Sequence, residues 1–186
     1  SYKVYHQHKA FLEIKGKCII NYVIEALQQV ESIKDIYIVG SKLKLEQTLN
    51  ESGVDSQHPK TIHLVEQQAN LYENIFHTFL KTIPNGESEL VNDLETSQYK
   101  DKAVLIVPCD SPLLTAHELE YFISHCDINN FDHVLGLISE KALKTFYPTE
   151  RLPGIKMAYL HLKENNYRIN NLHLVKPLRI ANRQYI

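Results

Sequence analysis

The sequence is short of several features that mark whole classes of protein. Its 186 residues hold no tryptophan, one methionine and only three cysteines. Cys18, Cys109 and Cys126 are odd in number, widely spaced and form no Cys-x-x-Cys pair, which disfavours a disulfide framework or a zinc finger. No apolar run approaches the ~18 to 20 residues of a membrane-spanning helix, and no signal-peptide pattern opens the sequence. We therefore expect a cytoplasmic protein with no membrane partner.

An excess of charge of one sign is also missing. The sequence has 20 Lys and Arg against 22 Asp and Glu, so it offers no general basic surplus to neutralise a nucleic-acid backbone. With 44% hydrophobic and 23% charged residues, the composition is that of a globular protein. Its length fits one domain. These features predict a single domain over residues 1–186 with a small-molecule or nucleotide ligand and no nucleic-acid partner.

Helical and strand-like patterns of apolar residues alternate along the chain. Helices are predicted for residues 19–30, 42–52, 70–83 and 115–126, and strands for residues 9–14, 35–40, 61–65, 103–108, 131–139, 155–162 and 172–175. Residues 84–102, rich in polar and turn-forming types, predict a solvated connection, and residues 177–186 look like the start of a helix. The alternation predicts an α/β fold of three layers (α/β/α) around a mostly parallel central sheet.

A carboxylate follows the most apolar of the predicted strands. Val104 to Val107 form an unbroken apolar run, and Asp110 stands three residues later in a turn stiffened by Pro108 and Pro112. In sheets of this kind ligands bind beyond the carboxyl ends of the strands. Magnesium prefers oxygen ligands and takes one or two protein carboxylates. Asp110 is therefore a candidate magnesium ligand, and the alternative is that its side chain only caps a turn.

Three further patterns bear on the site. Thr115 and Glu118 have the spacing of a capping box, which predicts a helix beginning just after the Asp110 turn. His6 and His8 would face the same side of a strand, but such a pair at a chain start is more typical of a surface than of a zinc site. Cys109 is either a reactive thiol or a buried, inert one, and its place at the end of an apolar strand favours the inert interpretation.

The segment Asp110-Ser-Pro-Leu-Leu-Thr resembles the metal-binding turn of nucleotidyltransferases with a dinucleotide-binding-like fold. That family includes molybdenum-cofactor guanylyltransferases and sugar-1-phosphate nucleotidyltransferases. Lys9 to Lys17 is similar to the family's Lys-x-Leu-x-x-Ile-x-Gly-Lys segment, and Leu71 to Ile75 stands where the family has its second nucleotide-side segment. Arg168 to Val175 is similar to the late strand that completes the metal site. The resemblance implies a nucleotide-diphospho-sugar transferase-like fold.

The resemblance also implies an activity and its residues. The activity is magnesium-dependent transfer of a nucleoside monophosphate from a nucleoside triphosphate to a phosphorylated acceptor, with release of pyrophosphate. Such chemistry relies on positioning and on charge stabilisation. The implied roles are Asp110 as main Mg²⁺ ligand, Asn171 as second or water-mediated ligand with Asn170 as the neighbouring candidate, Lys9 neutralising phosphate charge, Asn74 contacting base or ribose, and Lys156 facing the acceptor phosphate. Without the resemblance, these lysines and asparagines read as surface and turn residues.

The sequence departs from the family at its start. The family's first strand and glycine-rich phosphate-binding loop should precede Lys9, and Ser1 to His8 contain no glycine. Two explanations stay open, a fragment of a longer protein or a relative that has lost catalysis. A non-catalytic nucleotide-binding or interaction domain is therefore the alternative function. A glycosyltransferase that uses a nucleotide-sugar is a weaker alternative, because Asp110-Ser111-Pro112 lacks the second aspartate of an Asp-x-Asp motif.

Overall fold

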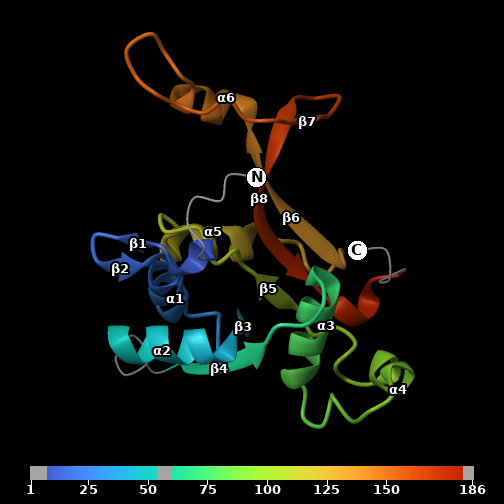
Figure 1. Ribbon diagram of the computed structural model, residues 1–186. Helices are drawn as coiled ribbons and strands as arrows, with labels where there is room; N and C mark the ends of the chain where they lie inside the picture. The colour runs from blue at the N-terminus through green and yellow to red at the C-terminus, as the bar shows by residue number, and fades with distance from the viewer. Residues whose placement is uncertain (1–7, 54–59, 182–186) are drawn as a thin grey trace.

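The computed structural model describes residues 8–53 and 60–181 of the chain (Figure 1). The helices are η1 (Lys9–Phe11), α1 (Ile19–Gln28), α2 (Lys42–Ser52), α3 (Leu71–Lys81), α4 (Val91–Thr96), α5 (Ala116–His125), α6 (Glu140–Leu143), η3 (Lys144–Phe146) and η4 (Pro177–Arg179). The strands are β1 (Glu13–Ile14), β2 (Lys17–Cys18), β3 (Asp35–Gly40), β4 (Thr61–Glu66), β5 (Val104–Ile106), β6 (His133–Ser139), β7 (Leu160–His161) and β8 (Asn166–Val175). Within these described ranges, no helix has the length and apolar character needed to cross a membrane.

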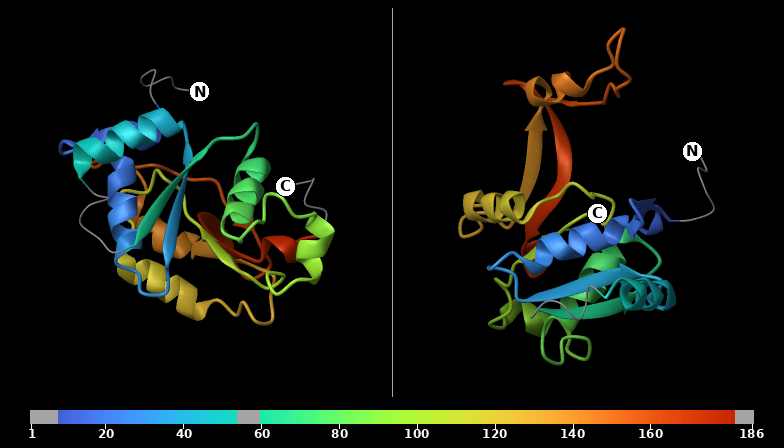
Figure 2. Two further views of the ribbon diagram at one scale, coloured as in Figure 1. Left: turned by 90° about the horizontal axis from the view of Figure 1, so that it is seen from below. Right: turned by 90° about the vertical axis from the view of Figure 1, so that its left-hand side faces the viewer.

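Helices cover both faces of the strands, as the three-layer prediction requires (Figure 2). On β5, Leu105 packs with residues of α1 and α5, whereas Val104 packs with residues of α3 and α4. Successive side chains of a strand point to opposite faces, so β5 lies between two helical layers. On β3, Ile38 packs against α1 and α2, while the Tyr37 hydroxyl on the other face donates to the Lys81 carbonyl in α3 at 3.4 Å. The same alternation therefore holds on β3.

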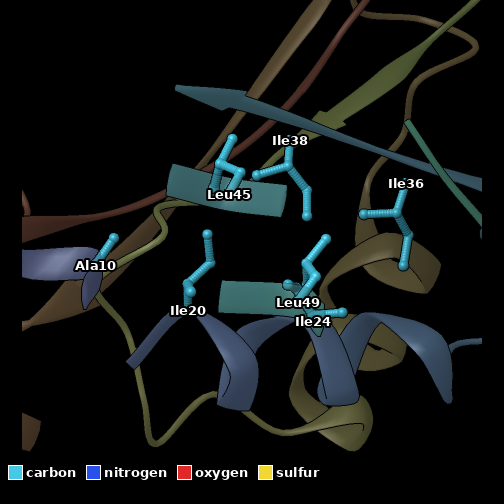
Figure 3. Close-up of a cluster of buried hydrophobic side chains, with 7 residues drawn as sticks. All are labelled: Ala10, Ile20, Ile24, Ile36, Ile38, Leu45 and Leu49. Carbon is cyan, nitrogen blue, oxygen red and sulfur yellow. The ribbon is translucent and has the colours of Figure 1, made fainter. Parts of the chain in front are cut away.

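The best-defined part of the core lies between α1, α2 and β3 (Figure 3). Ile20 and Ile24 lie four residues apart on α1 and meet Ile36 and Ile38, which lie two apart on β3. Helical and strand periodicities place each pair on one face of its element. All four side chains are at most 7% exposed. Burying an aliphatic side chain of this size contributes roughly 1.5–3 kcal/mol, so this cluster fixes how α1 lies on β3.

Strand pairing is parallel in one part of the fold and antiparallel in another. β3 and β4 pair in parallel from Asp35↔Thr61 to Gly40↔Glu66. β8 pairs antiparallel with β5, β6 and β7. The predicted α/β class is confirmed, and the predicted parallel arrangement holds for β3 with β4. β5 and β6 share one direction, and β8 runs against both.

The segment predicted as a strand over residues 9–14 folds differently. η1 occupies Lys9–Phe11, and β1 then pairs with β2 in a tight hairpin. The two turn residues, Lys15 and Gly16, have φ angles of 53° and 76°. Two consecutive residues with positive φ suit a two-residue hairpin turn, whose twist matches that of the flanking strands. The glycine at the second position is therefore a turn residue, and the extended prediction is wrong for residues 9–11.

Several other elements begin or end at residues different from the predicted ones. β5 ends at Ile106, two residues before Pro108, which lacks the N–H that a ladder needs. The strand predicted for residues 155–162 is only β7, whereas β8 begins at Asn166 rather than at residue 172. α4 forms inside the predicted connection, and Pro177–Arg179 form a 3₁₀ turn. The predicted capping box of Thr115 and Glu118 is confirmed at the start of α5.

Two strands carry part of the chain away from the rest. β6 and β8 run out of the packed layers and end in α6, η3 and β7, which project from the molecule in Figure 1 and in the right-hand view of Figure 2. We call residues 137–171 the arm, and residues 8–53, 60–136 and 172–181 the body. The ladder between β6 and β8 is continuous from the body, at His133↔Val175, to the arm, at Ser139↔Tyr167. It sets the direction in which the arm projects.

Candidate functional site

The structure brings together two of the residues singled out in the sequence, Lys9 and Asp110. Lys9 Nζ lies 3.9 Å from Asp110 Oδ2, and their side chains are 77% and 42% exposed. The pairing follows from packing of the neighbouring residues: Ala10 is 3% exposed in the core cluster that Cys109 packs against. η1 and the turn after β5 are thereby held side by side. An ammonium and a carboxylate, both open to solvent, therefore face each other.

Asn171 lies on β8, two residues before His173, which forms the last pair between β8 and β5, Ile106↔His173. Its neighbour Leu172 shares an apolar cluster with Val107, which follows β5. Asn171 is exposed and has a φ of 62°, in the left-handed region that asparagine tolerates better than most residues. The structure therefore places Asn171 next in the chain to a residue that packs with the segment leading into Asp110.

A bulge in β8 produces this conformation. Between the pairs Leu135↔His173 and Leu137↔Ile169, β8 has three residues opposite the single Gly136 of β6. Asn170 folds back into the bulge, and its Oδ1 accepts a hydrogen bond from the Leu172 N–H at 3.0 Å. The side-chain oxygen of Asn170, the neighbouring candidate for the metal site, thus makes a local hydrogen bond. The role of Asn170 that the structure supports is to hold the shape that presents its neighbour.

Gly136 is a residue that the sequence interpretation missed. A Cβ atom at this position would lie 2.1 Å from Asn170 Oδ1, well inside van der Waals contact. Glycine is therefore required for the Asn170 side chain to lie against β6. The available signal was a single glycine within the apolar run of residues 131–139, a pattern typical of a bulge or of close approach between backbones.

Asn74 lies in the first turns of α3, after the carboxyl end of β4. Its Oδ1 accepts a hydrogen bond from the Gln68 N–H at 2.6 Å, and so it ties down the loop between β4 and α3. Asn70 caps the same helix by accepting from the Glu73 N–H. Contact with a base or ribose would therefore use the amide nitrogen of Asn74. That contact stays a prediction.

The last residue predicted to bind substrate, Lys156, lies on the arm. It is exposed in the segment between η3 and β7, away from the layers that hold Lys9 and Asp110 (Figure 1). Its role toward an acceptor phosphate stays a prediction. Of the histidine pair, His6 lies outside the described residues. His8 is exposed, as the surface interpretation predicts, and it caps η1 by accepting from the Ala10 N–H at Nδ1.

The electrostatics around Asp110 suit an oxygen-liganded cation better than thiol chemistry. Burial, and secondarily the Asp110 carboxylate, raise the pKa of the Cys109 thiol, so it stays protonated, in agreement with the inert interpretation. Within residues 8–53 and 60–181, no three His, Cys, Asp or Glu side chains gather as a metal cluster. A carboxylate with a nearby amide is a donor set that Mg²⁺ accepts when substrate phosphates and water complete its coordination. The residues present therefore fit that ion.

Comparison with known proteins agrees with this geometry. The family model of the MobA-like NTP transferase domain matches residues 5–166. The chain belongs to this family. The match includes η1, the Asp110 turn and most of the arm. No curated protein gave a significant sequence match.

The fold of this MobA-like domain is also similar to that of several solved structures. A hypothetical transferase from Thermus thermophilus has a TM-score of 0.59 at 20% identity, over 91% of this chain and 56% of that one. A 4-diphosphocytidyl-2C-methyl-D-erythritol synthase from Anaerococcus prevotii has a TM-score of 0.58 at 12% identity, over 91% and 64%. A CMP:2-keto-3-deoxy-manno-octonic acid synthetase complexed with CTP has a TM-score of 0.54 at 12% identity, over 95% and 74%. The chain thus spans about six-tenths of the first two structures, and all three share the nucleotide-diphospho-sugar transferase-like fold.

Proposed function

We propose that the protein transfers a nucleoside monophosphate from a nucleoside triphosphate to a phosphorylated acceptor. An oxygen of the acceptor phosphate forms a bond to the α-phosphorus, the bond from that phosphorus to the bridging oxygen breaks, and pyrophosphate leaves. The observation that carries the proposal is the 3.9 Å approach of Lys9 Nζ to Asp110 Oδ2 at the edge of a MobA-like NTP transferase domain. The pair supplies a cation for phosphate and a carboxylate for a metal.

In this proposal each residue acts by position and charge. Lys9 neutralises charge on the triphosphate, and Asp110 holds Mg²⁺ with Asn171 as second or water-mediated ligand. Mg²⁺, when bound, screens the phosphates and stabilises charge that develops on the leaving pyrophosphate. Asn170 and Gly136 keep Asn171 in its bulge. Asn74 contacts the base or ribose, and Lys156 faces the acceptor phosphate.

The first test is release of pyrophosphate by the full-length protein. The assay contains Mg²⁺, each of the four common nucleoside triphosphates, and a panel of phosphorylated sugars, alcohols and cofactors. We expect release that depends on one acceptor and is abolished in Asp110→Ala. Removal of a group that stabilises transition-state charge typically lowers the rate by roughly 10²–10³-fold or more. Unchanged release in Asp110→Ala would contradict the mechanism.

A matched control tests whether the loss of pyrophosphate release is specific to Asp110 or follows from removing any exposed carboxylate. Asp93→Ala removes another exposed carboxylate, on α4 in the body, and should leave release unchanged. Lys9→Ala should lower the rate less than Asp110→Ala and raise the KM for the triphosphate, because it removes phosphate binding but no metal ligand. Binding of Mn²⁺ followed by electron paramagnetic resonance gives a second readout, expected to weaken in Asp110→Ala and Asn171→Ala. Nucleotide binding without release across the panel would instead favour a non-catalytic nucleotide-binding domain.

The cytoplasm is part of the same proposal. The three cysteines are free thiols in the structure, in agreement with a reducing compartment. The measurement is fractionation of cells that produce the protein, with the proposed location contradicted by recovery outside the cytoplasmic fraction.

A further inference from the structure

One side of β4 is a free strand edge. β3 pairs with the other side and lies between β4 and the remaining strands of the body (Figure 1). Within residues 8–53 and 60–181, no strand pairs with the free side. Edge strands usually carry a lysine, a proline or a bulge that discourages pairing with another chain. β4, with the sequence Thr-Ile-His-Leu-Val-Glu and an unbroken register, has none of these protections.

The backbone groups on this free side belong to Ile62 and Leu64. In a parallel ladder, alternate residues of a strand direct their N–H and C=O groups toward the same neighbouring strand. The Gln67 N–H donates to the Gly40 carbonyl at 3.1 Å, so residues 61, 63 and 65 direct their backbone groups toward β3. Ile62 and Leu64 therefore direct theirs outward. Among the described residues, none forms a hydrogen bond with these outward groups.

The free side of β4 forms the floor of a groove of about 870 Å³. One wall is α2, with Lys42 and Glu46, and the other is the end of α3 with the turn that follows it, within residues 80–88. The groove therefore follows the strand edge between elements that cover opposite faces of the sheet. A single extended segment fits between these walls. A second folded domain would meet the walls before its own strand edge reached β4.

The charges in the groove neutralise one another. Lys42 Nζ lies 4.0 Å from Glu46 Oε1 on one wall, and Lys81 Nζ lies 2.7 Å from Glu87 Oε1 on the other. A nucleotide or nucleic-acid backbone would need a surplus of positive charge, which these pairs do not leave. The outward groups of β4 recur every second residue, at roughly 6.6–6.8 Å. An extended peptide backbone has donors and acceptors at the same spacing, so it matches this edge.

We propose that this groove binds an extended, uncharged peptide segment of another protein, which adds to β4 as a further strand. The backbone of the segment would bond with the N–H and C=O groups of Ile62 and Leu64, and its side chains would provide specificity. The side chains of Ile62 and Leu64 pack against the core cluster below α2. Every second residue of the bound segment should therefore be apolar. Peptide binding is independent of the proposed nucleotidyl transfer, because no residue that lines the groove belongs to the candidate site.

The probe is a phage-displayed library of random short linear peptides, selected on the full-length protein. We expect the recovered peptides to have alternating apolar residues and to slow hydrogen exchange at the Ile62 and Leu64 amides, followed by nuclear magnetic resonance. Leu64→Pro removes the outward N–H at an edge position that tolerates proline. This variant should bind the peptides about tenfold more weakly, or worse, because a peptide carbonyl loses its donor. Leu64→Ala is the matched control, since it shortens the same side chain and keeps the N–H, and it should retain binding.

A second variant tests the groove without changing β4. Ser88 is exposed on the groove wall, and Ser88→Trp should fill the groove and abolish peptide binding. Ser124→Trp, at an exposed position on α5, should bind the peptides as wild type does. Circular dichroism and thermal denaturation check that each variant is folded.

Four outcomes would overturn the proposal. The library could yield no peptide that binds the protein, or the recovered peptides could bind Leu64→Pro and Ser88→Trp as tightly as wild type. The amides of Ile62 and Leu64 could become protected as the concentration of the protein alone is raised, which would assign the edge to a second copy. They could also become protected by a nucleoside triphosphate without peptide, which would assign the groove to a nucleotide.

Discussion

The body and the arm are held together by different forces. Among the described residues, every buried hydrophobic side chain lies in the body, where three clusters pack between helices and strands. The arm has a strand ladder and polar contacts but no buried residue. The body therefore has a hydrophobic core of its own, whereas the arm depends on the body for its position.

The candidate residues are divided between the two regions. Asp110 and Lys9 are held by the core of the body, and Asn171 lies at the base of the arm, in the bulge that interrupts the β6–β8 ladder. The difference between the regions can be tested by comparing matched substitutions in each.

The largest expected difference is between two phenylalanines. Phe79 in the body is 1% exposed, and Phe146 in the arm is 66% exposed. Phe79→Ala should lower the free energy of unfolding by about 3–5 kcal/mol, because it leaves a cavity in a closed cluster. Phe146→Ala should change it by no more than about 0.5 kcal/mol. Urea denaturation measures both, and a large loss at Phe146 would mean that the arm has a core of its own.

The next largest effect is expected at Gly136, at the boundary between the regions. Gly136→Ala places a Cβ atom against the Asn170 side chain, which should lower the free energy of unfolding by about 1–3 kcal/mol. Asn170→Gly removes the side chain with which the new Cβ atom would clash. The double variant should therefore recover part of the lost free energy of unfolding. A double-mutant cycle by urea denaturation should give a coupling of roughly 0.5–3 kcal/mol. Additive losses would show that the two residues do not touch.

Much of the body could be predicted from the sequence because its signals are local and agree with one another. The apolar stripe of α1, the short β-branched run of β3 and the capping box of α5 each specify one element by periodicity or by hydrogen-bonding chemistry. Asp110 was singled out by its place after an apolar strand, although that place also suits a turn cap, and the family resemblance supplied the metal-binding role. Its ion pair with Lys9 depends on two segments about a hundred residues apart, and only the family resemblance indicated that both belong to one site.

The arm and the bulge were predicted less well because their structure depends on pairing between distant segments. Residues 155–162 look strand-like from their apolar content, yet only Leu160 and His161 pair, with β8. Asn170 was predicted as the neighbouring candidate for the metal site, and its side chain makes a hydrogen bond within its own strand because Gly136 leaves room for it. Single-residue patterns do not reveal which glycine faces which asparagine.

A smaller difference is expected between two helix caps. Thr115 caps α5 in the body by accepting from the Glu118 N–H, and Ser139 caps α6 in the arm by accepting from the Ala142 N–H. Thr115→Ala should lower the free energy of unfolding by about 1 kcal/mol, the usual cost of losing a cap on a packed helix. Ser139→Ala should have no measurable effect, because α6 is a single turn with no buried residue. Thermal denaturation distinguishes them, and equal losses would show that unfolding of the arm is coupled to unfolding of the body.

The smallest effect is expected from a histidine of the body that stacks on its neighbour across the ladder. His133 Nε2 and His173 Nδ1 lie 2.9 Å apart, and burial, followed by the charge of His133, lowers the pKa of His173. The unfolded chain therefore binds a proton at this position more readily than the folded one. The stability that His173 contributes is fully present above its ordinary pKa of 6.5 and is lost as the pH falls through the lowered value. His173→Gln should flatten the fall in melting temperature between about pH 7 and pH 5, a range set by the ordinary histidine pKa. His161→Gln, on the arm, should leave the fall in melting temperature as steep as in wild type. If both variants flattened that fall, the pH dependence would not distinguish the body from the arm.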